Sequence, residues 1–507
     1  MQDSELLTGL NDEQAAAVTH EGSGLLILAG AGSGKTRVLT TKIAWLIKER
    51  GVDPYSILAV TFTKKAAGEM KERAIALESK ATYANIRTFH SFGAYFLRRY
   101  WQEAGVDKNF TVYDDDDSAS LLAKAIPGIK KSEAAILAKR IALAKDYGLT
   151  PDDDLSVLDG GDGVFAVQYR SYQKRLEQTG NVDFGDLILL PYITLKNNAL
   201  LRSDIHRRYR VIMVDEYQDS NIAQFLLLKE LSGVEEGAPT YVCVVGDDDQ
   251  SIYKFRGAEV QNILNFRDNF PGSDLIRLET NYRSTDMILS CAASLVSNNS
   301  GRLGKNLCSA RGKGKKPTLV FLPDQDDETE FCADMIENSL NKGGAYSDWA
   351  ILYRTNAQSL GFESCFLHRK IPYTLVGSLK FYEREEIKDL LSWLAFVANP
   401  RDEIAFRRIV NKPARGIGPG SQDKIVDAAF GKPLTETLDS VKLSKKAGEA
   451  LKDFFSIYKT FTDFLDENKD SELKLSEFIR LIVEKSGLKE HYESQDEISG
   501  SSKSDNM

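Results

Sequence analysis

The most chemically informative stretch of the sequence is a glycine-rich loop near the N-terminus. Residues 29–36 read AGAGSGKT and lie between a short apolar run and a helical pattern that starts near residue 35. Glycines let backbone N–H groups converge on phosphate oxygens, and the following helix adds a favourable dipole. Lys35 is then placed to reach the β- and γ-phosphates of a nucleotide, and Thr36 offers a hydroxyl to Mg²⁺. The loop departs from G-x4-G-K-[ST] only at its first position. The predicted phosphate-binding residues are Ala29, Gly30, Ala31, Gly32, Ser33, Gly34, Lys35 and Thr36.

Two further apolar runs end in polar residues that complete such a site. The run at residues 211–214 is followed by Asp215, which would hold Mg²⁺, and by Glu216, which is placed to orient or deprotonate an attacking water. The run at residues 241–245 leads to GDDDQ, where Gln250 would face the γ-phosphate. Alone, the acidic pair would fit a surface turn, and Gln250 would fit an ordinary turn amide. Together with Lys35 they predict Mg²⁺-dependent hydrolysis of a nucleoside triphosphate.

These residues must be positioned by a sheet whose strands end at one common edge. Short apolar runs recur ahead of helical patterns, which is typical of a parallel α/β fold. After the first run, Leu39, Ile43 and Leu46 fall on one helical face, and Gly51 and Pro54 end that helix. The predicted strands are residues 25–28, 57–61, 211–214, 241–245, 275–278 and 350–353.

Two long regions lack this alternation of strands and helices. Residues 91–190 contain few strand signals and two helical stretches, at 132–147 and 164–178, so they predict a helical insertion. Residues 383–507 are again helical and polar. The acidic run at 114–117 would suit either a metal site or a solvated loop, and the loop is favoured because adjacent carboxylates rarely converge on one ion.

Composition limits the class of protein. A length of 507 residues predicts three or four domains, and 42% hydrophobic with 27% charged residues is ordinary for globular chains. Five widely spaced cysteines form no CxxC pattern, so we expect buried thiols rather than disulfides or a zinc site. No apolar run is long enough to cross a bilayer and the first residues are acidic, so the expected location is cytoplasmic, without membrane contact. The net charge of −9 does not by itself indicate a nucleic-acid partner.

An ordered series of segments resembles the UvrD/PcrA/Rep group of superfamily 1A DNA helicases. The match covers nearly the whole chain and is therefore more specific than any one motif. The segments are Asn11 with Gln14, AGAGSGKT at 29–36, TFTKKAA at 61–67, TFHS at 88–91, DFGDL at 183–187, DEYQD at 215–219, GDDDQSIYKFRGA at 246–258, NYRS at 281–284, YRTNAQ at 353–358 and residues 381–391. The resemblance implies RecA-like, P-loop NTPase motor domains with parallel sheets and helical insertion domains.

The resemblance also implies further roles at the nucleotide. Gln14 would hydrogen-bond the adenine of ATP, and Tyr282 would stack on it. Arg37 would flank the base or the ribose. Arg283 would reach the γ-phosphate as an arginine finger, which makes hydrolysis depend on closure of a cleft.

A second implied set of residues contacts single-stranded DNA. Aromatic rings offer faces to successive bases, a mode of binding that tolerates any sequence. For each of these rings, core packing is the alternative that would be favoured without the resemblance. The implied DNA-binding residues are Phe62, Thr88, His90, Phe184, Tyr253, Phe255, Arg256 and Asn356. Phe255 stands where the family usually has Trp, and we expect weaker stacking there.

The family pattern predicts a division of the chain into motor domains and insertions. Residues 1–90 and 191–280 would form motor domain 1A, and 91–190 its helical insertion 1B. Residues 281–382 would begin motor domain 2A, and 383–507 would form insertion 2B. The later family motifs, termed V and VI, are not found, so we expect both 2A and 2B to be incomplete.

The leading hypothesis is an ATP- and Mg²⁺-dependent DNA helicase that moves 3′ to 5′ on single strands. It would act at junctions of single- and double-stranded DNA, alongside proteins of repair or replication. Two alternatives stay open. One is a catalytically impaired fragment that binds ATP and single-stranded DNA; the other is a P-loop ATPase acting on protein substrates, which leaves Gln14 and the aromatic series unexplained.

Overall fold

The computed structural model describes residues 4–159, 161, 163–237, 240–253, 257–299, 301–376, 382, 384–429, 431–469, 475–499 and 503–506. The chain forms two compact units, residues 1–315 with 389–507, and residues 316–388. Within the described residues, no helix is both long enough and apolar enough to cross a membrane.

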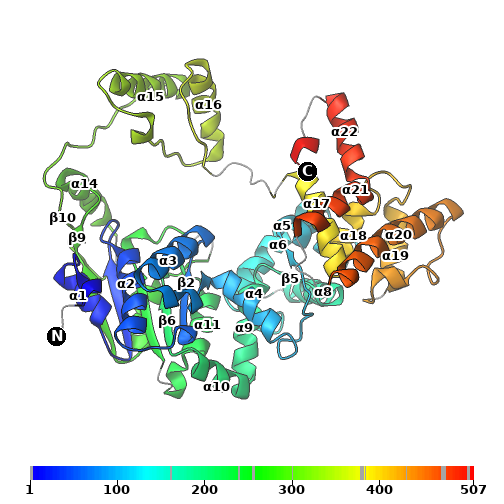
Figure 1. Ribbon diagram of the computed structural model, residues 1–507, viewed down its shortest axis with the longest axis horizontal. Coiled ribbons are helices and arrows are strands. Elements are labelled where there is room, and N and C mark those ends of the chain that lie inside the picture. The colour runs from blue at the N-terminus through cyan, green and yellow to red at the C-terminus, as the bar shows by residue number, and fades with distance from the viewer. Residues whose placement is uncertain are drawn as a thin grey trace. The chain divides into compact units, whose positions relative to one another are not determined.

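A six-stranded parallel sheet organises the first unit (Figure 1). Its strand order is β3-β2-β6-β7-β1-β8, so the chain crosses over the sheet between most strands. Five of the six strands confirm sequence predictions, and β3 was not predicted. The strands are β1 (Gly24–Ala29), β2 (Ile57–Thr61), β3 (Asn85–Thr88), β6 (Val211–Val214), β7 (Tyr241–Gly246) and β8 (Ser273–Leu278).

Successive residues of the central strands enter two different cores. In β1, Leu26 and Leu28 face one core, whereas Leu25 and Ile27 face the other. Such strands read as continuous apolar runs because both faces of the sheet are covered. The second core is closed by the helices α1 (Asp12–Thr19), α2 (Lys35–Lys48) and α3 (Lys64–Leu77).

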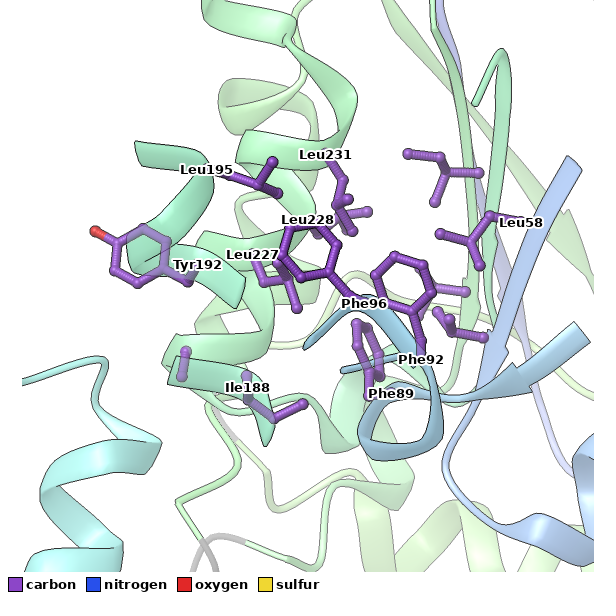
Figure 2. Close-up of a cluster of buried hydrophobic side chains, with 14 of the residues drawn as sticks. Leu58, Phe89, Phe92, Phe96, Ile188, Tyr192, Leu195, Leu227, Leu228 and Leu231 are labelled. Carbon is purple, nitrogen blue, oxygen red and sulfur yellow. The ribbon is translucent and has the colours of Figure 1, made fainter. Parts of the chain in front are cut away.

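The opposite face of the sheet is covered by a larger aromatic core. Figure 2 shows Phe89, Phe92 and Phe96 between the strand residue Leu58 and leucines of the neighbouring helices. Each fully buried side chain of this kind stabilises the fold by roughly 1.5–3 kcal/mol. The helices are α4 (Phe89–Arg99), α9 (Asp186–Asn197), α10 (Ala199–Arg208) and α11 (Ile222–Ser232).

A separate helical core lies between α4 and α9 in the sequence. It contains Tyr113, Leu137 and Tyr169, and it carries a two-stranded parallel pair that the sequence did not predict. The elements are β4 (Val112–Tyr113), α5 (Asp115–Ala125), α6 (Lys131–Asp146), α7 (Ser156–Asp159), α8 (Val164–Thr179) and β5 (Val182–Asp183).

The acidic run at 114–117 is not the loop that we predicted. Asp114 caps α5, its side chain accepting a hydrogen bond of 2.9 Å from the backbone of Asp117, and the remaining acids form the first helical turn. Carboxylates are favourable there because the N-terminus of a helix carries partial positive charge.

The C-terminal helices form a third core around Trp393, Phe406 and Phe454. They are tied to the helical insertion by Asp402, a buried carboxylate that accepts hydrogen bonds of 2.7 Å from both Thr111 and Tyr113. The helices are α17 (Glu385–Ala398), α18 (Glu403–Ile409), α19 (Pro419–Ala429), α20 (Lys445–Glu467), α21 (Leu475–Ser486) and α22 (Leu488–Ser499).

Two short helices, α12 (Gln261–Leu264) and α13 (Phe266–Asn269), lie between β7 and β8 in the sequence. The short parallel pair β9 (Thr280–Asn281) and β10 (Cys308–Ser309) brackets α14 (Asp286–Val296). Cys291 and Cys308 are exposed, so the expectation of uniformly buried thiols is wrong: α14 buries no residue against a second layer.

The second unit packs α15 (Gln325–Leu340) against α16 (Ser359–His368). The predicted strand at residues 350–353 does not form, and Leu352 is 90% exposed. A strand needs a hydrogen-bonded neighbour, and the described residues of this unit contain none. The predicted domain boundary at residue 281 falls inside the first unit.

Candidate nucleotide site and nucleic-acid interface

The predicted phosphate loop joins β1 directly to the first turn of α2. Gly32 and Gly34 have φ angles of 73° and 90°, a region that favours glycine because it has no Cβ. The buried Ser33 hydroxyl donates 2.8 Å to the carbonyl of Gly30 and closes the loop on itself. The loop therefore presents the N-terminus of α2 at the carboxyl edge of the sheet, where an anion is favoured.

Lys35 and Glu216 meet at this edge. Lys35 Nζ lies 2.7 Å from Glu216 Oε2, and the lysine side chain is only 11% exposed. Burial pushes the pKa of Glu216 upward, but the Lys35 ammonium and hydrogen bonds from Gln218 and Lys35 outweigh it and leave the pKa below its ordinary value. Glu216 is thus ionised at neutral pH and able to accept a proton.

Glu216 has a left-handed backbone, with φ 51°. This region is uncommon for residues other than glycine and costs of order 1–3 kcal/mol, so the surrounding contacts must impose it. In the turn that follows β6, Asp215 Oδ1 accepts a hydrogen bond of 3.0 Å from the Glu216 backbone N–H. The turn separates the two adjacent carboxylates: Glu216 contacts Lys35, whereas Asp215 contacts the backbone N–H of Glu216.

Asp215 and Thr36 offer a donor set that suits Mg²⁺, because both present oxygen atoms. Asp215 is buried at the end of β6, and Thr36 lies in the first turn of α2. Burial, with the adjacent Glu216 carboxylate, raises the pKa of Asp215 to about 6 despite the lowering effect of Lys35. The group remains mostly ionised at pH 7, so these residues fit the metal.

Gln218, to which the sequence analysis assigned no role, contacts the predicted catalytic groups. Its buried amide donates 2.9 Å to Glu216 Oε2 and accepts 3.0 Å from the backbone N–H of Asp247. Its backbone carbonyl also accepts a hydrogen bond of 3.1 Å from the Ser251 hydroxyl. The turn after β7 is thereby fixed to Glu216, the predicted catalytic base. The available signal for Gln218 was its place in the DEYQD segment at 215–219, two residues after Glu216.

Gln250 lies in that turn, as predicted, but its amide is turned toward Asp247 Oδ2. Asp247, Asp248 and Asp249 are the one set of acids, among the described residues, close enough to share a metal ion. The ammonium of Lys305 occupies that position, 2.6–2.7 Å from all three carboxylates. The three carboxylates therefore form an ion-pair network with the Lys305 ammonium, which takes the place that a metal ion would need.

The predicted base-binding residues flank the phosphate loop. Gln14 is buried, donates 2.8 Å to the carbonyl of Ser33, and forms a capping box with Asn11 at the start of α1. The Tyr282 hydroxyl accepts 3.1 Å from the Asn11 amide, and 47% of Tyr282 is exposed. Arg37 is exposed on the first turn of α2. Adenine recognition by these residues stays a prediction.

A buried lysine holds the helix that carries Gln14. Lys42 Nζ donates to the carbonyls of Ala17, Val18 and His20 at 2.8–3.1 Å, which closes the C-terminus of α1. Burial lowers the pKa of Lys42 to about 8. This role could not be predicted from the sequence, because it depends on contacts made after folding.

The residues that precede and include Arg283 lie against the phosphate loop. The backbone N–H of Tyr282 donates 2.9 Å to the carbonyl of Gly32, and the Asn281 amide donates to the carbonyl of Ala31. A Cβ on Gly32 would lie 2.5 Å from Arg283 Cβ, so only glycine permits this approach. The structure thus brings Arg283 beside the phosphate loop, as predicted.

Three of the predicted nucleic-acid residues, Phe62, His90 and Tyr253, follow β2, β3 and β7 at the same carboxyl edge, and Phe184, which follows β5, stacks on His90. Phe62 and Tyr253 pair with ring centroids 5.1 Å apart, and His90 and Phe184 stack at 3.9 Å. Phe184 is 55% exposed, so its ring keeps a face open to solvent. Burial lowers the pKa of His90 to about 4, so its ring is neutral at pH 7.

The four other predicted DNA contacts have different outcomes. Thr88 is buried and caps α4, its hydroxyl accepting 3.1 Å from the backbone of Ser91, so it positions the segment that carries His90. Phe255 and Arg256 lie outside the described residues. Asn356 is exposed in the second unit.

Comparison with known proteins agrees with this geometry. The UvrD/REP helicase N-terminal domain matches residues 10–271, and the UvrD-like helicase C-terminal domain matches residues 276–447. The chain is 38% identical to the ATP-dependent DNA helicase PcrA of Staphylococcus aureus strain Mu50, over 99% of this chain and 69% of that protein. The PcrA of Staphylococcus epidermidis strain ATCC 12228 gives the same identity and coverage. The chain therefore belongs to the UvrD/REP helicase family.

Proposed function

We infer that the protein is an ATP-dependent DNA helicase that moves along single strands from 3′ to 5′. The observation that carries this inference is the 2.7 Å contact between Lys35 and Glu216, at the same sheet edge as the aromatic pairs. One edge thus offers a site for a nucleoside triphosphate and a platform for unpaired bases. Family membership supports the motor activity, and polarity and a role in repair or replication are proposed from the family.

The chemistry follows from the positions of the charged groups. Lys35 stabilises the negative charge that develops on the transferred phosphoryl group, and Glu216 accepts a proton from the attacking water. Thr36 and Asp215 would hold Mg²⁺, which neutralises charge on the β- and γ-phosphate oxygens when bound. Arg283, beside the phosphate loop, would add a second positive charge.

The link to DNA runs through a short segment. Gln218 fixes both Asp247 and Ser251, and the chain reaches Tyr253 two residues later. Tyr253 packs on Phe62. A change at Glu216 therefore acts, through one side chain, on the turn that carries a predicted base-stacking ring.

The test is ATP hydrolysis by the purified 507-residue chain, with and without single-stranded DNA, beside Lys35→Ala. We expect turnover that rises with DNA and is lost in the variant. Absence of turnover with retained ATP and DNA binding would instead favour the catalytically impaired alternative. Turnover that persists in Lys35→Ala would remove the site assignment.

Polarity is tested on duplexes with a single-stranded tail. A duplex with a 3′ tail should be unwound, and one with a 5′ tail should not. Equal unwinding of both substrates would contradict the proposed direction, and hydrolysis without unwinding of either would leave a translocase.

A further inference from the structure

Residues 302–311 connect two parts of the nucleotide site that are far apart in the sequence. The segment includes β10, which pairs in parallel with β9, Cys308 opposite Thr280 and Ser309 opposite Asn281. Its N-terminal end meets the turn after β7, and its C-terminal end meets Arg283.

Lys305 makes the contact at the first end. Its ammonium lies 2.6 Å from Asp247, 2.7 Å from Asp248 and 2.6 Å from Asp249. The lysine side chain is 2% exposed, and the three acidic side chains are at most 9% exposed. Burial lowers the pKa of Lys305, but these carboxylates outweigh that effect and raise it. The ammonium therefore stays charged throughout the physiological range.

Two neighbours of Lys305 strengthen the contact. Arg302 binds both oxygens of Asp249, at 2.5 and 2.7 Å, and the Leu303 backbone donates 2.8 Å to Asp248. Three carboxylates face two cations, so loss of Lys305 would leave buried negative charge without a partner, which is strongly unfavourable.

One of the acids that Lys305 contacts, Asp247, is linked by hydrogen bonds to the predicted catalytic groups. Asp247 accepts from the Gln250 amide, and its backbone donates 3.0 Å to Gln218. Gln218 in turn donates to Glu216, which contacts Lys35. Asp247 thus contacts the predicted phosphate sensor directly and is linked to Glu216, the predicted catalytic base, through the side chain of Gln218.

The other end of the segment contacts residues 281–284, the arm that carries Arg283. Arg311 donates 2.9 Å to the carbonyl of Arg283, and the Ser309 hydroxyl donates 2.7 Å to the carbonyl of Ser284. The Ala310 backbone donates 2.8 Å to the carbonyl of Asn281. The segment is therefore anchored both to the turn after β7 and to the residues around Arg283.

We propose that Lys305 is a positioning residue for ATP hydrolysis, which keeps the turn bearing Gln250 in register with the arm bearing Arg283. This inference rests on the proposed function. A residue of this kind changes the rate of the chemical step more than the affinity for ATP, because it aligns groups that act together in the transition state.

The test compares Lys305→Met with wild type in steady-state, DNA-stimulated ATP hydrolysis. We expect kcat to fall by about tenfold to a hundredfold, because small misalignments of reacting groups have effects of this size. KM for ATP should change by less than about threefold. Lys305→Arg should recover much of kcat, and Lys342→Met, at an exposed position of the second unit, serves as the matched control.

A double-mutant cycle separates positioning from general destabilisation. If Lys305 acts through Arg283, Lys305→Met should lower kcat by less than about twofold in an Arg283→Ala background. Additive losses, or an unchanged kcat in the single variant, would overturn the proposal. Loss of turnover in wild type would instead count against the proposed function.

Two measurements remain informative if Lys305→Met folds poorly or wild type does not turn over. Lys305→Met with Asp248→Asn removes one charge of each sign; recovery of normal turnover in that pair would overturn the proposal. Hydrogen exchange with a non-hydrolysable ATP analogue should show protection of residues 247–250 and 280–284 in wild type, and of only one of these segments in Lys305→Met. Equal protection of both in the variant would also overturn it.

Discussion

The two halves of the sheet edge solve different problems with different side chains. Beyond β1 and β6 lie the charged residues Lys35, Asp215 and Glu216, held within 2.7–3.0 Å of their partners; the side chains of Lys35 and Asp215 are largely buried, and that of Glu216 is partly buried. Near the ends of β2 and β3 lie aromatic rings, such as Phe184, which stacks on His90 and keeps an exposed face.

The difference follows from how each interaction depends on distance and direction. Charge stabilisation in a partly buried site is strong but fails when donor and acceptor move by an ångström. Stacking tolerates sliding and any base, because every base offers a π-face. A motor that grips successive bases needs the second property where it holds DNA and the first where it hydrolyses ATP.

The largest expected effect is at the charged half. Lys35→Ala should reduce ATP turnover by at least about 10²–10³-fold, because it removes a charge that stabilises the transition state. Binding of single-stranded DNA without nucleotide should change little. A parallel loss of DNA binding, measured by fluorescence anisotropy, would contradict the claim that the two halves of the sheet edge have separate functions.

Gln218→Leu should have the next largest effect. It keeps the size of the side chain but removes the hydrogen bonds to Glu216 and Asp247, so we expect roughly a tenfold to hundredfold lower kcat, as for other residues that orient catalytic groups. The measurement is kcat with saturating ATP and DNA. An unchanged kcat would show that the turn after β7 does not need this anchor.

Phe184→Ala should weaken single-strand binding by about 1–3 kcal/mol, the size of one base stack. ATP affinity should be unchanged. The matched control is Tyr55→Ala, which removes an exposed ring that pairs with Tyr83, 5.2 Å away, before the start of β2 and β3. Equal loss of binding in both variants would indicate a nonspecific effect.

The smallest effect concerns His90 and pH. The pKa of the folded His90 is about 4, below the value near 6.5 of an unfolded chain, so unfolding takes up a proton between these values. Stability contributed by the neutral ring is complete above pH 6.5 and is lost as the pH falls toward 4.

His90→Phe should therefore reduce the fall in the urea midpoint between pH 7 and pH 5. His368→Phe, at an exposed position, is the comparison. The same acid sensitivity in His90→Phe and wild type would show that this ring is not buried as a neutral base.

The central strands were predictable because each is a run of residues buried on both faces, such as GLLILA in β1. β3 was missed because NIRT alternates buried and partly exposed residues and contains only one large apolar side chain. Residues 350–353 were wrongly predicted as a strand, since an apolar run forms a strand only where a neighbouring strand is present to pair with it.

The phosphate loop and the acids after β6 were predictable because their chemistry is encoded by adjacent residues. The contacts that fix them were not. Lys305 lies 57 residues from Asp248, and Gln218 lies 29 residues from Asp247, so only the fold reveals these pairs. Local motifs thus identify the reacting groups, whereas their alignment depends on long-range packing.

The most direct test of coupling between the two halves is the affinity for single-stranded DNA with and without a non-hydrolysable ATP analogue. Binding of one ligand must change the affinity for the other by the same factor in both directions, if the sites are linked. The account predicts a clear difference in the dissociation constant for wild type, which Gln218→Leu reduces. Identical dissociation constants with and without the analogue would contradict it.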